Sequence, residues 1–165
     1  MDTNATRLAD AAQDETWMRV ALAEAREAHA RGDWPTGAVI VRDGVMLATG
    51  QNRQNSLGDV TAHAETEALK AAFREHGAQA VRGTTLYCTM EPCPMCAGAL
   101  KIAGVHTLVL ALRHATLRRS DLGAYSVERF CELTGYPLVL RDGVLQAEYL
   151  ALRRAWGQDP VAPAS

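Results

Sequence analysis

Apolar residues recur at helical spacing near the start of the chain, between two stretches rich in polar residues. Over residues 14–31 they return at every third or fourth position, which places them on one side of a helix. These positions are Trp17, Ala21, Ala25 and Ala28. Gly32 follows directly and is a typical residue just after a helix end. The pattern therefore predicts a helix over residues 14–31.

A second pattern, rich in β-branched and small apolar residues, follows at residues 36–41 and again at 45–50. Asp43-Gly44 separates the two stretches and is a strong two-residue turn signal between antiparallel strands. We therefore expect a β-hairpin here.

Helix and strand patterns continue to alternate through the rest of the chain. Further helices are predicted over residues 62–76, 94–103, 125–134 and 145–156. Further strands are predicted over residues 84–89, 106–112 and 137–140. The stretch 106–112 is almost continuously apolar, which is typical of a strand covered on both faces of a sheet.

This alternation predicts an α/β fold, a three-layer α/β/α sandwich built on a mixed sheet of about five strands. We expect one domain over residues 14–158, preceded by a flexible lead over residues 1–13 and followed by a flexible tail over residues 159–165.

Composition and charge narrow the class of protein. The 165 residues are 48% hydrophobic and 22% charged, as in ordinary globular domains. The net charge of −2 gives no general reason to expect an anionic partner. No apolar run approaches the roughly 20 residues that span a bilayer, and no signal peptide is evident. Two of the four cysteines belong to a candidate metal site, which argues against a disulfide framework and for a reducing compartment, so we expect a cytoplasmic protein without membrane contacts.

Two short motifs carry the candidate chemistry. His63-Ala64-Glu65 opens one predicted helix, and Pro92-Cys93-Pro94-Met95-Cys96 opens another. His63, Cys93 and Cys96 offer three zinc ligands, and a zinc site with three protein ligands keeps a position for water. Zinc lowers the pKa of such a water to about 7, and the Glu65 carboxylate is placed to take up its proton.

Each motif has a less specific interpretation when taken alone. An HxE triplet in a helix is common, and a C-x-x-C pair can be a redox pair or half of a structural zinc site. Their combination is the H-x-E…P-C-x-x-C signature of zinc deaminases. The other two cysteines, Cys88 and Cys131, are expected to be small apolar residues of the core.

The chain resembles the cytidine deaminase-like superfamily, and within it the branch of tRNA adenosine, guanine and fungal-type cytosine deaminases. The resemblance covers roughly residues 15–115. It rests on blocks around Pro35–Val41, Gly50–Asn52, Thr61–Glu65 and Thr89–Ala99. It implies zinc as the cofactor and a homodimer as the assembly.

The resemblance also implies roles for individual residues. His63, Cys93 and Cys96 would hold the zinc, and Glu65 would be the catalytic proton shuttle. Asn52 would bind the substrate, although an Asn that only shapes a loop is the alternative. Glu91 would contribute to substrate binding through the backbone beside Pro92 rather than through its side chain.

The substrate is harder to predict. His114 lies where guanine deaminases carry a similar Ala-x-x-His arrangement, and the segment lacks the Ala-Arg-Asp pattern of tRNA enzymes; a surface histidine is the alternative. We therefore expect a hydrolytic deaminase of a small nucleobase or nucleoside, with guanine-like purines favoured. A tRNA adenosine-to-inosine deaminase is the second interpretation. A non-catalytic zinc scaffold is the third, and it would not need Glu65.

Overall fold

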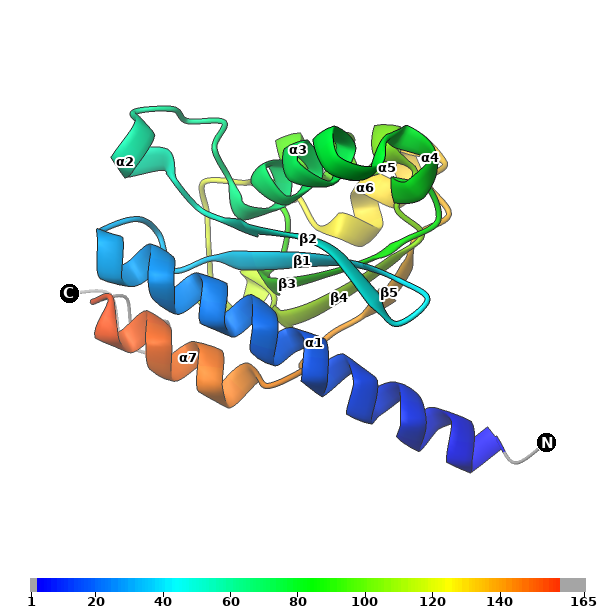
Figure 1. Ribbon diagram of the computed structural model, residues 1–165. Coiled ribbons are helices and arrows are strands. Elements are labelled where there is room, and N and C mark those ends of the chain that lie inside the picture. The colour runs from blue at the N-terminus through cyan, green and yellow to red at the C-terminus, as the bar shows by residue number, and fades with distance from the viewer. Residues whose placement is uncertain (1–2, 158–165) are drawn as a thin grey trace.

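A mixed five-stranded sheet with strand order β2-β1-β3-β4-β5 forms the centre of the protein (Figure 1). The computed structural model describes residues 3–157, with side chains from residue 10 onward. The strands are β1 (Gly37–Arg42), β2 (Val45–Gln51), β3 (Thr85–Met90), β4 (Thr107–Leu112) and β5 (Val139–Arg141). β1 pairs antiparallel with β2 and β3, whereas β4 runs parallel to β3 and β5.

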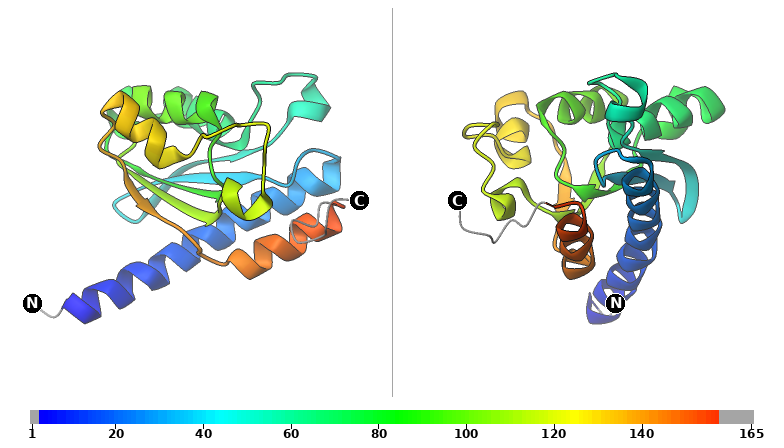
Figure 2. Two further views of the ribbon diagram at one scale, coloured as in Figure 1. Left: turned by 180° about the vertical axis from the view of Figure 1, so that it is seen from behind. Right: turned by 90° about the vertical axis from the view of Figure 1, so that its left-hand side faces the viewer.

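Helices cover both faces of this sheet, so the predicted three-layer α/β/α sandwich is confirmed (Figures 1 and 2). One face carries α1 (Thr3–Arg31) and α7 (Gln146–Ala155). The other carries α3 (Ala64–His76), α4 (Ala78–Val81), α5 (Pro94–Ala103) and α6 (Val127–Thr134). The short helices α2 (Gln54–Leu57) and η1 (His114–Leu117) lie in loops. Within residues 3–157, no helix is both long and apolar enough to cross a membrane.

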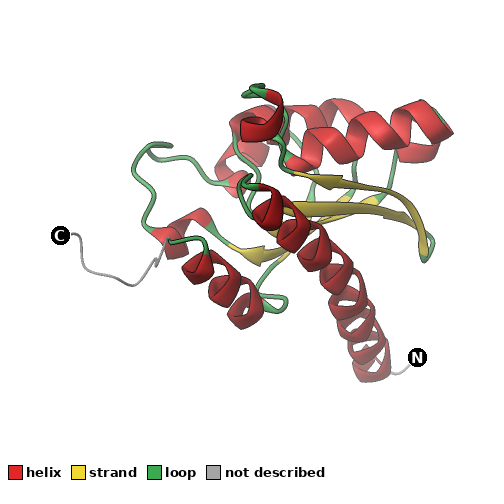
Figure 3. Ribbon diagram, turned by 60° about the vertical axis from the view of Figure 1, so that its left-hand side comes forward, coloured by secondary structure: helices red, strands yellow, loops and turns green. Residues whose placement is uncertain are grey.

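The N-terminal boundary differs from the prediction. Helix α1 begins at Thr3 and extends past the edge of the sheet (Figure 3), so the expected flexible lead over residues 1–13 is helical for most of its length. Residues 3–13 contain no Gly or Pro, which allows the helix to continue backward from its packed part. The predicted tail over residues 159–165 lies outside the described residues.

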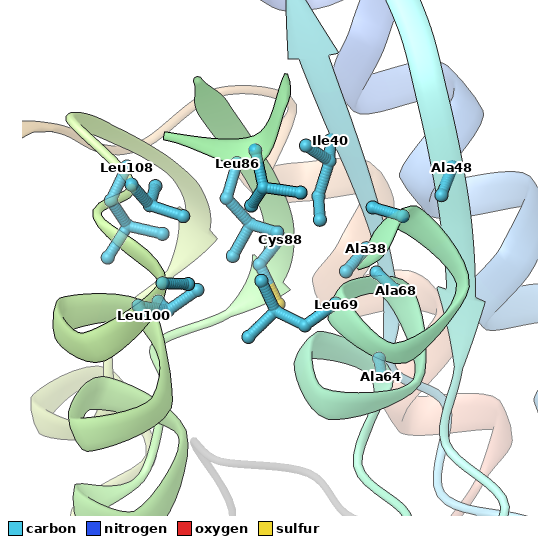
Figure 4. Close-up of a cluster of buried hydrophobic side chains, with 14 of the residues drawn as sticks. Ala38, Ile40, Ala48, Ala64, Ala68, Leu69, Leu86, Cys88, Leu100 and Leu108 are labelled. Atoms are coloured by element: carbon cyan, nitrogen blue, oxygen red, sulfur yellow. The ribbon is translucent and has the colours of Figure 1, made fainter. Parts of the chain in front are cut away.

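Two clusters of buried apolar side chains fill the spaces between the layers. The cluster beneath α3 and α5 includes Leu86, Leu100 and Leu108 (Figure 4). Cys88 belongs to this cluster and is fully buried, and Cys131 packs against it, so both predictions are confirmed. The second cluster joins α1 and α7 to the opposite face of the sheet. All six residues of β4 are buried, as its apolar run predicted.

A close contact between β2 and α3 sets the position of the first turn of α3. A Cβ atom on Gly50 would lie 2.1 Å from the carbonyl oxygen of Ala64 and 2.4 Å from the amide nitrogen of Ala68. Only glycine permits this approach, because any side chain would force the helix away from the strand. The start of α3 is therefore held directly against the sheet, next to the start of α5.

Candidate metal centre and active site

His63, Cys93 and Cys96 lie together where the N-termini of α3 and α5 meet. His63 is the N-cap of α3, and its backbone N–H donates to Thr66 Oγ1 at 3.1 Å. Cys93 is the N-cap of α5, and Cys96 lies in its first turn after Pro94. Proline is well suited to the first helical position, where its missing N–H costs no hydrogen bond. The starts of the two helices thus bring the three predicted ligands together.

The spacing of the three ligand atoms fits a zinc ion. His63 Nδ1 lies 3.7 Å from Cys93 Sγ and 3.5 Å from Cys96 Sγ, and all three atoms lie within 4.8 Å of one another. Zinc–sulfur and zinc–nitrogen bonds of about 2.3 and 2.0–2.1 Å in a tetrahedron would separate N and S by about 3.6 Å. The donor set of two sulfurs and one imidazole also suits zinc.

The electrostatics of the cluster favour a cation. A hydrogen bond with the Cys96 thiol, together with the nearby His63 imidazole, lowers the pKa of Cys93 to about 4. The same hydrogen bond and burial raise the pKa of Cys96, because two thiolates repel each other when no cation lies between them. A divalent ion removes that repulsion and deprotonates coordinating thiols. The helix N-terminus also favours the thiolate form.

Glu65 lies in the first turn of α3, two residues after His63, and is 3% exposed. Burial raises the pKa of its carboxyl group, because the charged form loses its solvation. A carboxyl group whose pKa moves toward neutrality can both accept and return a proton. The position and environment of Glu65 therefore suit proton transfer beside the metal ligands.

A cavity of about 770 Å³ opens directly onto these groups. His63, Glu65 and Cys93 line it, and so do the three residues that the sequence predicted to bind substrate, namely Asn52, Glu91 and His114. Its walls further include Trp34, Thr36, Gln54, Met90, Leu117, Arg119, Asp121, Arg153 and Gly157. The volume lies within the range of pockets that take small molecules, about 300–1,000 Å³.

Asn52 is buried in this wall, and its amide is partly engaged by the chain itself. Its Oδ1 accepts a hydrogen bond from the Gln54 N–H at 3.1 Å, and its Nδ2 donates to Gln54 Oε1 at 3.1 Å. The backbone of the loop is held by Asp33, whose Oδ1 accepts from the N–H groups of Asn55 and Ser56. Asn52 thus shapes its loop, and an amide has capacity for one further donor and acceptor contact.

The side chain of Glu91 does more than the sequence suggested. It is 2% exposed, and its carboxylate accepts hydrogen bonds from the backbone N–H groups of His114 at 2.8 Å and Val127 at 2.9 Å. It also pairs with Arg113 at 3.1 Å, and Arg113 in turn contacts Glu128 and Asp142. Glu91 therefore ties the end of β3 to the segment after β4 and to the start of α6.

Replacing Glu91 by alanine is expected to destabilise the protein by about 3 kcal/mol. The substitution would leave two buried N–H groups and the Arg113 guanidinium without their shared acceptor. The matched control is Glu128→Ala, which removes a half-exposed partner of the same arginine and should cost less than about 1 kcal/mol. Denaturant unfolding of both variants measures the difference. Equal effects would show that the Glu91 carboxylate has no special structural role.

His114 lines the cavity from a segment that the two metal-binding motifs did not cover. It begins η1, is 6% exposed, and its ring lies 6.1 Å from that of Tyr125. Burial lowers the pKa of His114. The interpretation of His114 as a surface histidine is therefore wrong, whereas its role in substrate binding stays a prediction.

Sequence reasoning missed several residues of the cavity. Gln54, Trp34, Arg119 and Asp121 line it, and Arg119 Nε donates to Asp121 Oδ1 at 2.9 Å. Of these four, only Arg119 had a local signal in the sequence, because it forms with Arg118 a basic pair that a tRNA-binding interpretation would use. Trp156 contacts Trp34, with ring centroids 6.0 Å apart, so the C-terminal helix reaches the side of the cavity.

Comparison with known proteins identifies a family whose model matches most of this chain. Residues 11–112 match the model of the cytidine and deoxycytidylate deaminase zinc-binding region. The chain is 45% identical over 92 residues to a tRNA-specific adenosine deaminase of Agrobacterium fabrum. These 92 residues are 56% of this chain and 60% of that protein. It is 41% identical over 101 residues to a guanine deaminase of Bacillus subtilis, 61% of this chain and 65% of that protein. The chain thus spans less than two thirds of either relative.

A solved structure from a study of A-to-I editing by tRNA:A34 deaminases at the wobble position has the same fold. Its TM-score is 0.73 at 34% identity, and the match covers 83% of this chain and 98% of that one. Together with the His/Cys/Cys cluster, the match to the zinc-binding region confirms the predicted zinc cofactor.

Proposed function

This chain belongs to the cytidine and deoxycytidylate deaminase family, and from that membership we propose that it is a zinc-dependent hydrolytic deaminase of a purine base. The observation that carries the proposal is a buried carboxylate, Glu65, which lines a cavity together with members of a His/Cys/Cys cluster that could hold a metal ion. A non-catalytic zinc scaffold has no use for this carboxylate or for the cavity.

His63, Cys93 and Cys96 would hold the zinc, which when bound supplies an activated water at neutral pH. Glu65 would take a proton from the incoming water and deliver it to the exocyclic amine, so that water adds and ammonia leaves. Asn52 would orient the base through the donor and acceptor capacity that Gln54 leaves unused. The buried walls would exclude other water from the reacting groups.

Adenosine within a tRNA is the substrate that the relatives favour. Relatives of the family include tRNA-specific adenosine deaminases at 45% and 40% identity, and the solved neighbour comes from a study of tRNA:A34 deaminases. This ranking reverses the order expected from the sequence, which placed guanine-like free bases first. We therefore propose a tRNA adenosine as the first substrate class. The cytoplasmic location and the homodimer stay predictions.

A free guanine-like base is the second candidate, and two observations support it. The relative from Bacillus subtilis is a guanine deaminase. In addition, the charge of Arg119 in the cavity wall is neutralised by Asp121, so this arginine is less available to a phosphate. Such a wall fits a neutral base at least as well as a polyanion.

Ammonia release from a substrate panel tests the proposal and separates the two candidates. The panel holds guanine, adenine, cytosine, their nucleosides, and a tRNA with adenosine at position 34. A tRNA with guanosine at that position is the matched control, and Glu65→Ala protein is the blank. We expect turnover of the adenosine-34 tRNA alone, with binding that weakens steeply as salt rises. Turnover of free guanine alone would favour the second candidate, and no turnover at all would contradict the proposed function.

A further inference from the structure

His114 has a buried imidazole whose two nitrogens are both without a hydrogen-bond partner among the described residues. The residue is 6% exposed and lines the cavity that contains the metal ligands. Buried polar groups are nearly always hydrogen-bonded, and a group that is not usually has a functional reason. The unmatched nitrogens of His114 therefore point to a ligand that enters the cavity.

The neighbours of the His114 ring hold it in place without hydrogen-bonding its two nitrogens. The backbone N–H of His114 donates to Glu91, and the Tyr125 ring packs against the imidazole. The Tyr125 hydroxyl donates to the Pro92 carbonyl oxygen at 2.7 Å, so this carbonyl already accepts one hydrogen bond. Even if one imidazole nitrogen turned toward that carbonyl, the second nitrogen would still lack a partner. The imidazole is thus held in position before a ligand binds, and its ring nitrogens are available to hydrogen-bond that ligand.

His114 lies just beyond the residues that match the family model. The family match ends at Leu112, whereas His114 and its neighbours in the cavity wall, Leu117, Arg119 and Asp121, follow it. The metal ligands and Glu65 all lie within the matched residues. The lining of the cavity therefore combines residues within the family match with residues that follow it, among them residues 114–121.

We propose that His114 hydrogen-bonds the substrate base directly and is a specificity-determining residue of this cavity. The inference rests on the proposed function and adds to it the contact that distinguishes one purine from another. An imidazole offers a donor at one ring nitrogen and an acceptor at the other, and purines present both kinds of group along their edges. A site built to hydrogen-bond its substrate rejects an analogue that lacks the matching group, because a buried polar group is then left unpaired.

The test compares His114→Phe and His114→Gln with the wild-type protein. Phenylalanine keeps an aromatic ring against Tyr125 but removes both nitrogens, whereas glutamine restores an amide donor and acceptor. The matched control is His106→Phe, since His106 directly precedes β4, whereas His114 follows it, and His106 does not line the cavity. For each protein, kcat and KM are measured on every substrate of the panel that the wild type turns over, and zinc content is measured in parallel.

We expect His114→Phe to lower kcat/KM by about 10–100-fold, mainly through KM, and to change the order of preferred substrates, while zinc content stays at the wild-type level. His114→Gln should recover part of the loss, and His106→Phe should match the wild type. An unchanged substrate order in His114→Phe, with kcat/KM within about twofold of the wild type, would overturn the inference and leave the proposed function intact. If the wild type turns over nothing in the panel, the proposed function fails, and this inference fails with it.

Discussion

Replacing Glu65 by alanine is expected to leave zinc bound and to lower turnover by at least about 10²–10⁴-fold, the contribution of a general acid–base group. The carboxylate is buried beside the cluster of His63, Cys93 and Cys96 but is not needed as a ligand, because these three already offer a complete protein donor set for a catalytic zinc. Loss of the carboxylate therefore removes the proton acceptor and donor without opening the metal site.

The measurement is single-turnover ammonia release together with zinc content and thermal unfolding. Glu67→Ala is the matched control, because Glu67 lies two residues further along the same helix. Its carboxylate forms a solvent-exposed ion pair with Lys70. It should retain full turnover. Wild-type turnover in Glu65→Ala would contradict the role of this carboxylate, and loss of zinc in that variant would make Glu65 a ligand instead.

Replacing Cys93 by serine or His63 by alanine is expected to abolish zinc binding and turnover together. Each residue supplies one of three donor atoms that lie within 4.8 Å of one another, and two protein donors hold zinc far less tightly than three. The loss of affinity should exceed the roughly 10–100-fold that follows from removing a residue that only supports a ligand. Metal analysis of purified protein and ammonia release measure the two losses.

Cys131→Ser is the matched control for the cysteine variant. Cys131 packs against the core cluster beneath α5, away from the metal ligands, so this variant should keep both zinc and turnover. Chelator treatment of the wild type provides the reverse experiment, since activity should return when zinc is added back. Full turnover in metal-free protein would exclude the proposed mechanism.

Much of the fold followed from local sequence patterns. Helix α5 has the predicted limits at Pro94 and Ala103, and the apolar run of β4 is buried along its whole length. The start of α1 was predicted too late, because a polar stretch without strong apolar periodicity can still continue a helix that is packed further along. The one-turn helices α2, α4 and η1 were missed, since four residues are too few to show a period.

The candidate site, like the fold, has one part that the sequence predicted and another part that it did not. The candidate metal ligands and Glu65 could be predicted because each motif lies within one helix turn, and the chemistry of zinc restricts the residue types. The engagement of Asn52 by Gln54 and the buried contacts of Glu91 could not be recognised, because they depend on how loops fold back. The substrate prediction relied on the same loops, and the relatives favour its second interpretation over its first.

The sequence by itself determined the longer helices and the strands, and it showed the two motifs His63-x-Glu65 and Cys93-x-x-Cys96, since each of these depends on residues a few positions apart. Only the tertiary structure decided that the N-termini of α3 and α5 meet, and that Glu91 anchors residues 114 and 127. It also decided that His114 lies buried in the cavity wall, where no residue among 3–157 hydrogen-bonds its ring nitrogens. Those features join segments far apart in the chain. Their contacts arise from packing against a shared sheet, and packing leaves no periodic trace in the sequence.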